Sequence, residues 1–146
     1  MYKNINLYSL VAFFLQETKT RFKNKLKHPN YTFFEHIRKS GGGGGLITAV
    51  HNSLHPVLIR DAEEDIEVMV VESKIDDLKV RLINGYGPQE GNEVVATNFM
   101  NKIDFEVKSA KLSGALICIE MDANSKLGKD IIKGDPKEPA KKVKTT

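Results

Sequence analysis

Short apolar segments, each followed by turn-forming residues, dominate this chain and favour β-strands over helices. Six of them have strand character: Leu7–Leu15, Tyr31–Ile37, Leu46–Val50, Ile66–Glu72, Leu78–Tyr86 and Ala115–Met121. The first and the last are continuous apolar runs, which is typical of strands that are buried on both faces. The interval Ser73–Asp77 has turn chemistry and predicts an antiparallel hairpin between the fourth and fifth segments.

Only one segment has a clear helical period. Asn92 is a favourable N-cap, and apolar residues recur at every fourth position behind it: Val95, Phe99, Ile103 and Val107. This pattern predicts a helix over about Glu93–Lys111. Because one helix stands among six strands, and hairpins outnumber strand–helix alternations, the sequence predicts an α+β fold with mainly antiparallel or mixed sheets.

The length of 146 residues corresponds to one domain or less, and membrane-spanning proteins are excluded. The longest apolar stretch, Leu10–Leu15, is far shorter than the roughly 20 residues that cross a bilayer. The N-terminus does not have the pattern of a secretory signal. The single cysteine, Cys118, fits a reducing compartment. We therefore expect an intracellular location, with which a nuclear one is compatible.

The net charge of +3 comes from the C-terminal end of the chain. Residues 126–146 contain seven lysines and three acidic residues, whereas the other 125 residues have a net charge of −1. We expect residues 1–134 to form the domain. We expect residues 135–146 to be a disordered, solvated tail, because they contain too few apolar groups to offset their ordering entropy.

Polar side chains follow three of the predicted strands where each strand ends. Glu17 follows the first strand, Asn84 and Tyr86 close the fifth, and Asp122 and Asn124 follow the last. Binding sites often lie at the ends of strands on sheet scaffolds. A carboxylate from one strand and an Asp-x-Asn from another would suit Mg²⁺, which prefers oxygen ligands and assists the attack of water on a phosphoryl group.

Simpler interpretations of these residues stay open at this point. Glu17 taken alone is more typical of a strand-end charge in solvent, and Asp122 with Asn124 is typical of a turn. The alternating bases from Lys19 to Lys27 fit either contacts with a DNA backbone or a solvated loop. Cys118 lies in the middle of a predicted strand, where a small core residue is expected.

The five consecutive glycines, Gly41–Gly45, do not form a phosphate-binding loop, because no Gly-Lys-Ser/Thr follows and a strand comes next. We expect backbone positions with positive φ, or a close approach of another group. His51 and His55 stand four residues apart, but the Asn, Ser and Pro residues around them oppose a helix, so a metal-binding pair is not expected.

Four blocks stand out in order along the chain: Leu15–Lys19 (Leu-Gln-Glu-Thr-Lys), Gly41–Leu46, Asn84–Pro88 (Asn-Gly-Tyr-Gly-Pro) and Met121–Asn124 (Met-Asp-Ala-Asn). The first, third and fourth resemble the L-Q-E-T-K, N-x-Y-x-P and G-D-x-N patterns of the endonuclease/exonuclease/phosphatase superfamily, with methionine where the glycine usually stands. The second is similar to a glycine-rich strand start in the endonuclease domains of non-LTR (LINE-type) retrotransposons. The resemblance extends over about Leu7–Gly134.

This resemblance implies a partial DNase I-like fold, a four-layer αββα sandwich. The implied activity is phosphodiester hydrolysis, and for the retrotransposon branch it is nicking of DNA, which makes DNA the expected partner. Glu17 matches the family glutamate that binds Mg²⁺, with Mn²⁺ as the alternative ion.

The resemblance also implies roles for five further residues. Asp122 matches the aspartate that orients or deprotonates the attacking water. Asn124 matches the asparagine that contacts the phosphate or the nucleophile, and the Tyr86 hydroxyl matches the group that reaches the scissile phosphate. Asn84 and Lys19 are further candidates for substrate contacts.

Two parts of the family pattern have no match in this chain. Only sixteen residues precede Glu17, and Asn4 and Asn6 match the family's asparagine strand poorly. A Ser-Asp-His block should follow Asn124 at some distance, but the chain ends 22 residues later and its four histidines all come earlier. We therefore expect a domain truncated at both ends, with weak or no activity.

Two other hypotheses stay open beside the DNA-nicking enzyme, which is the first. The chain is alternatively a non-catalytic retrotransposon remnant or a binding module. A third hypothesis keeps the phosphodiesterase chemistry but replaces DNA with a lipid or inositol phosphate, since the superfamily includes such hydrolases.

Overall fold

The structure is a computed structural model that describes residues 10–21, 26–39, 43–89 and 92–124. Its elements follow one another in the order β1 (Ala12–Leu15), β2 (Tyr31–His36), β3 (Leu46–His51), the 3-10 helix η2 (Asn52–Leu54), β4 (Val57–Arg60), β5 (Glu67–Ile75), β6 (Leu78–Tyr86), α1 (Glu93–Leu112) and β7 (Leu116–Asp122). The predicted tail at 135–146 and the middle of the predicted basic segment, residues 22–25, lie outside the described residues.

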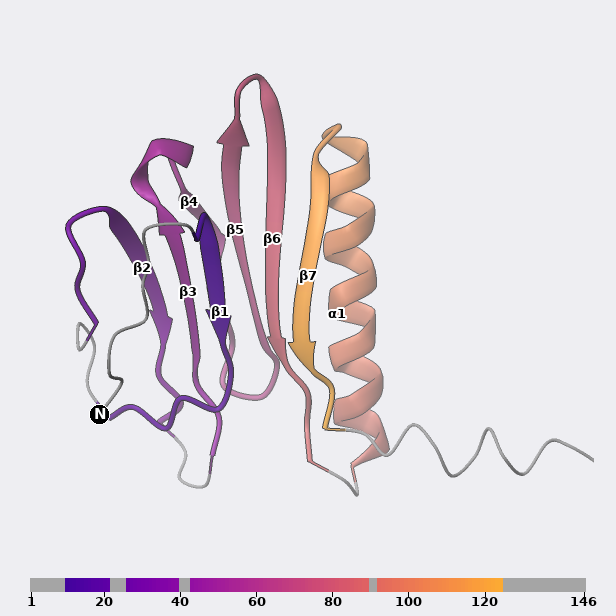
Figure 1. Ribbon diagram of the computed structural model, residues 1–146. Helices are drawn as coiled ribbons and strands as arrows, with labels where there is room; N and C mark the ends of the chain where they lie inside the picture. Colours follow the sequence, from indigo (N-terminus) through magenta and orange to yellow (C-terminus); the bar gives the residue numbers. More distant parts are fainter. Residues whose placement is uncertain (1–9, 22–25, 40–42, 90–91, 125–146) are drawn as a thin grey trace, which may run out of the picture.

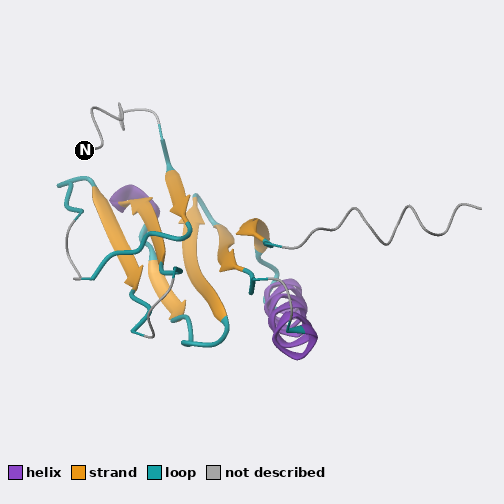
Figure 2. Ribbon diagram, turned by 90° about the horizontal axis from the view of Figure 1, so that it is seen from below, coloured by secondary structure: helices purple, strands orange, loops and turns teal. Residues whose placement is uncertain are grey.

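The strands form two sheets, with orders β1-β3-β2 and β4-β5-β6-β7. The β6–β7 pair is parallel and the other pairs are antiparallel. The sheets pack against each other, and α1 lies along the opposite face of the second sheet (Figures 1 and 2). The described residues thus form three layers, β, β and α, and the predicted α+β class with mixed sheets is confirmed.

The two central strands, β5 and β6, are buried on both faces. Successive side chains point to opposite sides of a sheet, and each side of these strands packs against another element. One face packs against β3 in a cluster formed by Leu46, Val50, Ala62, Met69, Val71, Val80, Leu82 and Tyr86. The other face packs against α1 in a cluster formed by Val68, Val70, Ile83, Phe99 and Ile103. These two clusters give the ends of β5 and β6 a rigid support.

The helix α1 begins where its cap predicts. The Asn92 side chain accepts a hydrogen bond from the Val95 backbone N–H at 3.1 Å. Such a cap satisfies one of the free N–H groups of the first turn. The helix buries Phe99 and Ile103, as the four-residue period predicts, and it ends one residue later than expected, at Leu112. Among the described residues, no helix combines the length and apolar character that crossing a membrane requires.

The outer strands are less buried than the sequence predicts. Within the described residues, β1 and β7 are edge strands: β1 is half-buried, and most side chains of β7 are exposed. The prediction of burial on both faces is therefore wrong for both strands, since no β1 side chain is fully buried and most β7 side chains are exposed. Cys118, in β7, is exposed, which corrects its placement in the core.

Two local features differ from the prediction or refine it. The strand β4 was not predicted, since most of its side chains are exposed and it is only four residues long. The hairpin turn is shorter than predicted and consists of Asp76 and Asp77, with Asp76 at φ 54°. His51 caps η2 by accepting a bond from the Ser53 N–H.

Candidate active site at the strand ends

The ends of β1, β6 and β7 point to the same edge of the molecule, the lower one in Figure 1. Across the two sheets, the Gln16 side-chain amide donates a hydrogen bond to Asn84 Oδ1 at 2.8 Å. Within the second sheet, Tyr86 and Asp122 are register partners in the parallel pair. The structure therefore brings together the three strand ends that carry Glu17, Tyr86 and Asp122.

Asn84 joins the two sheets from a fully buried position. Its Nδ2 group donates to the Ile47 carbonyl at 3.0 Å and to Thr48 Oγ1 at 3.1 Å, in addition to the bond that Oδ1 accepts from Gln16. A buried amide needs such partners, because an unsatisfied one costs about 1–3 kcal/mol. A substrate contact by Asn84 would require these bonds to open, so its predicted role in substrate binding competes with its role in the core.

The ends of β6 and β7 are joined through Gly87. Its N–H donates to the Asp122 carbonyl at 2.7 Å, and its own carbonyl accepts from Asn124 Nδ2 at 3.0 Å. A Cβ atom at position 87 would lie 2.8 Å from the Ala123 carbonyl carbon, which explains the need for glycine. Asp122 Oδ1 accepts the Asn124 N–H at 3.0 Å. Asp122 and Asn124 thus form the turn that the simpler interpretation expects, and this turn fixes Asp122 beside Tyr86.

Glu17 and Lys19 form an ion pair at the surface of this edge. Lys19 Nζ lies 2.9 Å from Glu17 Oε1, and the Glu17 side chain is 40% exposed. The hydrogen bond to Glu17 and its charge raise the pKa of Lys19, with a smaller contribution from Tyr86. Both backbones are left-handed, with φ of 51° at Glu17 and 50° at Lys19, an uncommon conformation for residues other than glycine.

The described part of the glycine run, Gly43–Gly45, supports this loop. All three glycines have positive φ, at 123°, 101° and 92°, as the sequence predicts. The Gly45 carbonyl accepts the Thr18 N–H at 3.2 Å, and the Gly44 carbonyl accepts the Lys19 N–H at 3.0 Å. The glycine run therefore holds the backbone at Thr18 and Lys19, directly after Glu17.

Solved structures with a similar fold include those of two proteins of the endonuclease/exonuclease/phosphatase superfamily, TDP2 and ANGEL2. TDP2 from D. rerio, complexed with a single-strand DNA product, matches with a TM-score of 0.60 and 19% identity, over 82% of this chain and 50% of that one. ANGEL2, a 2′,3′-cyclic phosphatase in complex with adenosine-2′,3′-vanadate, matches with a TM-score of 0.57 and 16% identity, over 81% of this chain and 41% of that one.

This chain has a DNase I-like fold. It spans half the length of the matched TDP2 chain and less than half of the ANGEL2 chain. No protein-family model matches the sequence, and no curated protein sequence matches it.

One residue at this edge of the fold was missed by the sequence prediction. Glu67, at the start of β5, is the register partner of Tyr86 and is only 3% exposed. Its Oε1 accepts the Gly45 N–H at 2.6 Å, and Arg38 Nη1 lies 3.8 Å from its Oε2. The only signal in the sequence was a charged residue at the beginning of an apolar strand, which is equally typical of an exposed strand start.

A cavity of about 390 Å³ opens beside Tyr86 at this edge of the DNase I-like fold. Glu67, Arg38 and Gly43 line one part of it, and Gln89 and Asn92 line the part next to the start of α1. The buried Tyr86 side chain therefore has access to solvent through a space that is large enough for part of a substrate.

The stability of the protein should depend on the ionisation of Glu67. Burial raises its pKa above the ordinary value of 4.5, and the Gly45 N–H, Arg38 and His36 offset part of this shift. Because the folded chain holds the proton to a higher pH than the unfolded chain, the free energy of unfolding should fall as the pH rises from about 4.5 through the raised pKa.

The Glu67→Gln variant lacks this titration. Urea unfolding of both proteins between about pH 4 and pH 8 should show the variant gaining stability relative to the wild type as the pH rises. A difference in the free energy of unfolding between the two proteins that does not change with pH would contradict a raised pKa for Glu67.

Proposed function

We propose that this chain is a Mg²⁺-dependent phosphodiesterase that nicks DNA, of the retrotransposon endonuclease type and with weak activity. The observation that carries the proposal is that the strand ends carrying Glu17, Tyr86 and Asp122 lie at one edge of a DNase I-like fold. The ordered motifs around these residues and the glycine-rich start of β3 favour the retrotransposon type.

The donor set at this edge fits a hard divalent cation. Glu17 would hold the ion through its exposed carboxylate, after release from Lys19, because Mg²⁺ commonly takes only one or two protein carboxylates and keeps several waters. Mn²⁺ would bind in the same way. Such an ion stabilises negative charge on a phosphoryl oxygen. The described residues contain no cluster of three or more His, Cys, Asp or Glu side chains suited to a metal, so the proposed ion would have Glu17 as its protein carboxylate and water as its other ligands.

The chain's own residues supply the remaining chemistry. Asp122 Oδ1 accepts a hydrogen bond from the Asn124 N–H, and this turn holds the Asp122 carboxylate in place. The carboxylate orients the attacking water and accepts a proton from it. The Tyr86 hydroxyl donates a hydrogen bond to the scissile phosphate from the wall of the cavity. Asn124 contributes its side-chain oxygen, since its Nδ2 donates to Gly87. Lys19, once released from Glu17, contacts a substrate phosphate.

The choice of DNA as substrate is supported by the motifs and by the matched TDP2 structure, which holds a single-strand DNA product. The two other hypotheses predict different results with the same protein. A binding module would shift duplex DNA in a gel, with an affinity that falls steeply with salt, but would not cut it. A lipid or inositol phosphatase would release phosphate from those substrates and leave DNA intact.

Nicking of supercoiled plasmid by the wild-type chain and by Glu17→Gln tests the proposal. We expect the wild type to nick slowly with Mg²⁺ or Mn²⁺ and not with EDTA, and the variant to lose at least about tenfold in rate because its amide binds a cation less well. Glu63→Gln is the matched control, since Glu63 is also an exposed glutamate paired with a lysine, at 3.3 Å from Lys102. Equal nicking by wild type and Glu17→Gln, or nicking in EDTA, would refute the proposed site.

A further inference from the structure

We propose that Glu67 is a positioning residue for Glu17. Its buried carboxylate holds Gly43–Gly45 in place, and this glycine segment in turn holds the loop that presents Glu17 to the cation. The inference rests on the proposed function. It extends that function to a residue that lies outside all four motif blocks and is separated from Glu17 by fifty positions in the sequence.

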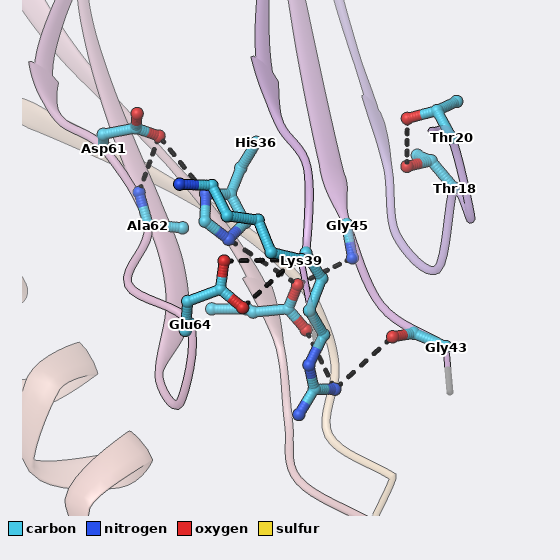
Figure 3. Close-up of polar contacts among 11 residues, drawn as sticks. Thr18, Thr20, His36, Lys39, Gly43, Gly45, Asp61, Ala62 and Glu64 are labelled. Atoms are coloured by element: carbon cyan, nitrogen blue, oxygen red, sulfur yellow. Dashed lines mark hydrogen bonds and ion pairs between the residues drawn. The ribbon is translucent and has the colours of Figure 1, made fainter. Parts of the chain in front are cut away.

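The first step is the contact between Glu67 and the glycine segment. Glu67 Oε1 accepts the Gly45 N–H at 2.6 Å in a buried environment. Arg38 and His36 approach the same carboxylate, with His36 Nε2 at 4.0 Å from Oε1. Figure 3 shows His36, Gly43 and Gly45 grouped around these contacts. A carboxylate that is removed from water needs such partners, so its position is well defined.

The second step is the fit of the glycine backbone against this carboxylate. A Cβ atom at Gly44 would lie 2.6 Å from Glu67 Oε2 and 2.9 Å from Arg38 Cδ. The segment thus needs glycine both for its positive φ values and for space. Glycine also has the largest conformational freedom to lose, so a segment of consecutive glycines needs external contacts to hold one conformation. Glu67 provides such a contact from the end of a rigid central strand.

The third step leads from the glycine segment to Glu17. The carbonyls of Gly44 and Gly45 accept the N–H groups of Lys19 and Thr18. The Glu17 side chain itself lies over Gly43, with Oε1 3.3 Å from the place that a Cβ atom there would take. Glu17 therefore has the glycine segment beneath its side chain and on the C-terminal side of its backbone. A shift of that segment would move the carboxylate.

Mn²⁺ binding, measured by the electron paramagnetic resonance of the free ion, tests the proposal independently of catalysis. Glu67→Met keeps the side-chain volume but removes the acceptor for Gly45, and we expect it to weaken Mn²⁺ binding about tenfold or more, as is typical when a group that orients a metal ligand is lost. Glu67→Gln keeps an acceptor oxygen and should stay within about threefold of the wild type.

Glu72→Gln is the matched control. Glu72 lies on the same strand and pairs with Arg81 at 2.8 Å, so its loss removes an ion pair of β5 without touching the glycine segment. We expect unchanged Mn²⁺ binding. Folded Glu67→Met that binds Mn²⁺ as the wild type does, or an equal loss in Glu72→Gln, would overturn the proposal.

Amide hydrogen exchange gives a second readout that needs no metal. In Glu67→Met the Thr18 and Lys19 amides should exchange faster than in the wild type, and in Glu72→Gln they should not. Glu67→Ala replaces the methionine variant if that variant does not fold. If the wild type and Glu17→Gln bind Mn²⁺ equally, the proposed function fails. If Glu17→Gln alone weakens Mn²⁺ binding and the exchange rates do not respond to Glu67, only the positioning role fails.

Discussion

Replacing Asp122 with alanine is expected to lower the rate of Mg²⁺-dependent plasmid nicking by about 100-fold or more, the usual contribution of a positioned general base. The variant keeps the main-chain bond from the Gly87 N–H to the residue 122 carbonyl, so the strand end should stay in place. What disappears is the carboxylate beside Tyr86 that we propose to orient and deprotonate the water. Initial rates of nicked-circle formation at saturating Mg²⁺ measure the effect.

Asp104→Ala is the control for this prediction. Asp104 is an exposed aspartate in the middle of α1 that forms an ion pair with Lys108. Its loss should leave the rate within about twofold of the wild type, because exposed pairs contribute little to stability. If Asp122→Ala nicks as fast as Asp104→Ala, Asp122 is a turn residue without a catalytic role.

The second large effect is expected from Gly44→Ala. The new Cβ atom would lie 2.6 Å from the buried Glu67 Oε2, in a backbone with φ of 101°. Overpacking and an unfavourable backbone conformation each cost about 1–3 kcal/mol, so the free energy of unfolding should fall by about 3 kcal/mol or more. Urea unfolding followed by circular dichroism measures this loss.

Gly114→Ala separates the two contributions. Gly114 also has positive φ, at 70°, but a Cβ atom there would meet nothing within 4 Å. Its substitution should cost only about 1–2 kcal/mol for the left-handed backbone. Equal losses at the two positions would show that contact with Glu67 does not restrain the glycine segment.

The elements that could be predicted from the sequence are those specified by local patterns. The cap and period of α1 are carried by neighbouring residues, and β2, β3 and the β5–β6 hairpin follow from short apolar runs with turns between them. Burial was harder to predict, because it depends on which strands lie alongside. Cys118 is in an apolar strand, yet it is exposed, because the burial of a side chain depends on whether another element covers that face of the sheet.

In the candidate site, too, local sequence patterns predicted some features, and contacts between distant segments determine the others. The motif resemblance identified Glu17, Tyr86 and Asp122, but their approach depends on the β6–β7 register and on the bond between Gln16 and Asn84, residues that are 68 positions apart. Glu67 was missed because its partner, Gly45, is 22 positions away and nothing near Glu67 in the sequence indicates burial. Contacts between distant segments, and not local propensity, determine these features.

The central claim is that Glu17 and Asp122 act in one site, and a double-mutant cycle on nicking tests it most directly. Residues that act as a unit have non-additive effects, so the Glu17→Gln/Asp122→Ala protein should be no slower than the slower of the two single variants. Rate losses that multiply, so that the double variant is slower by the product of the two single losses, would contradict the claim.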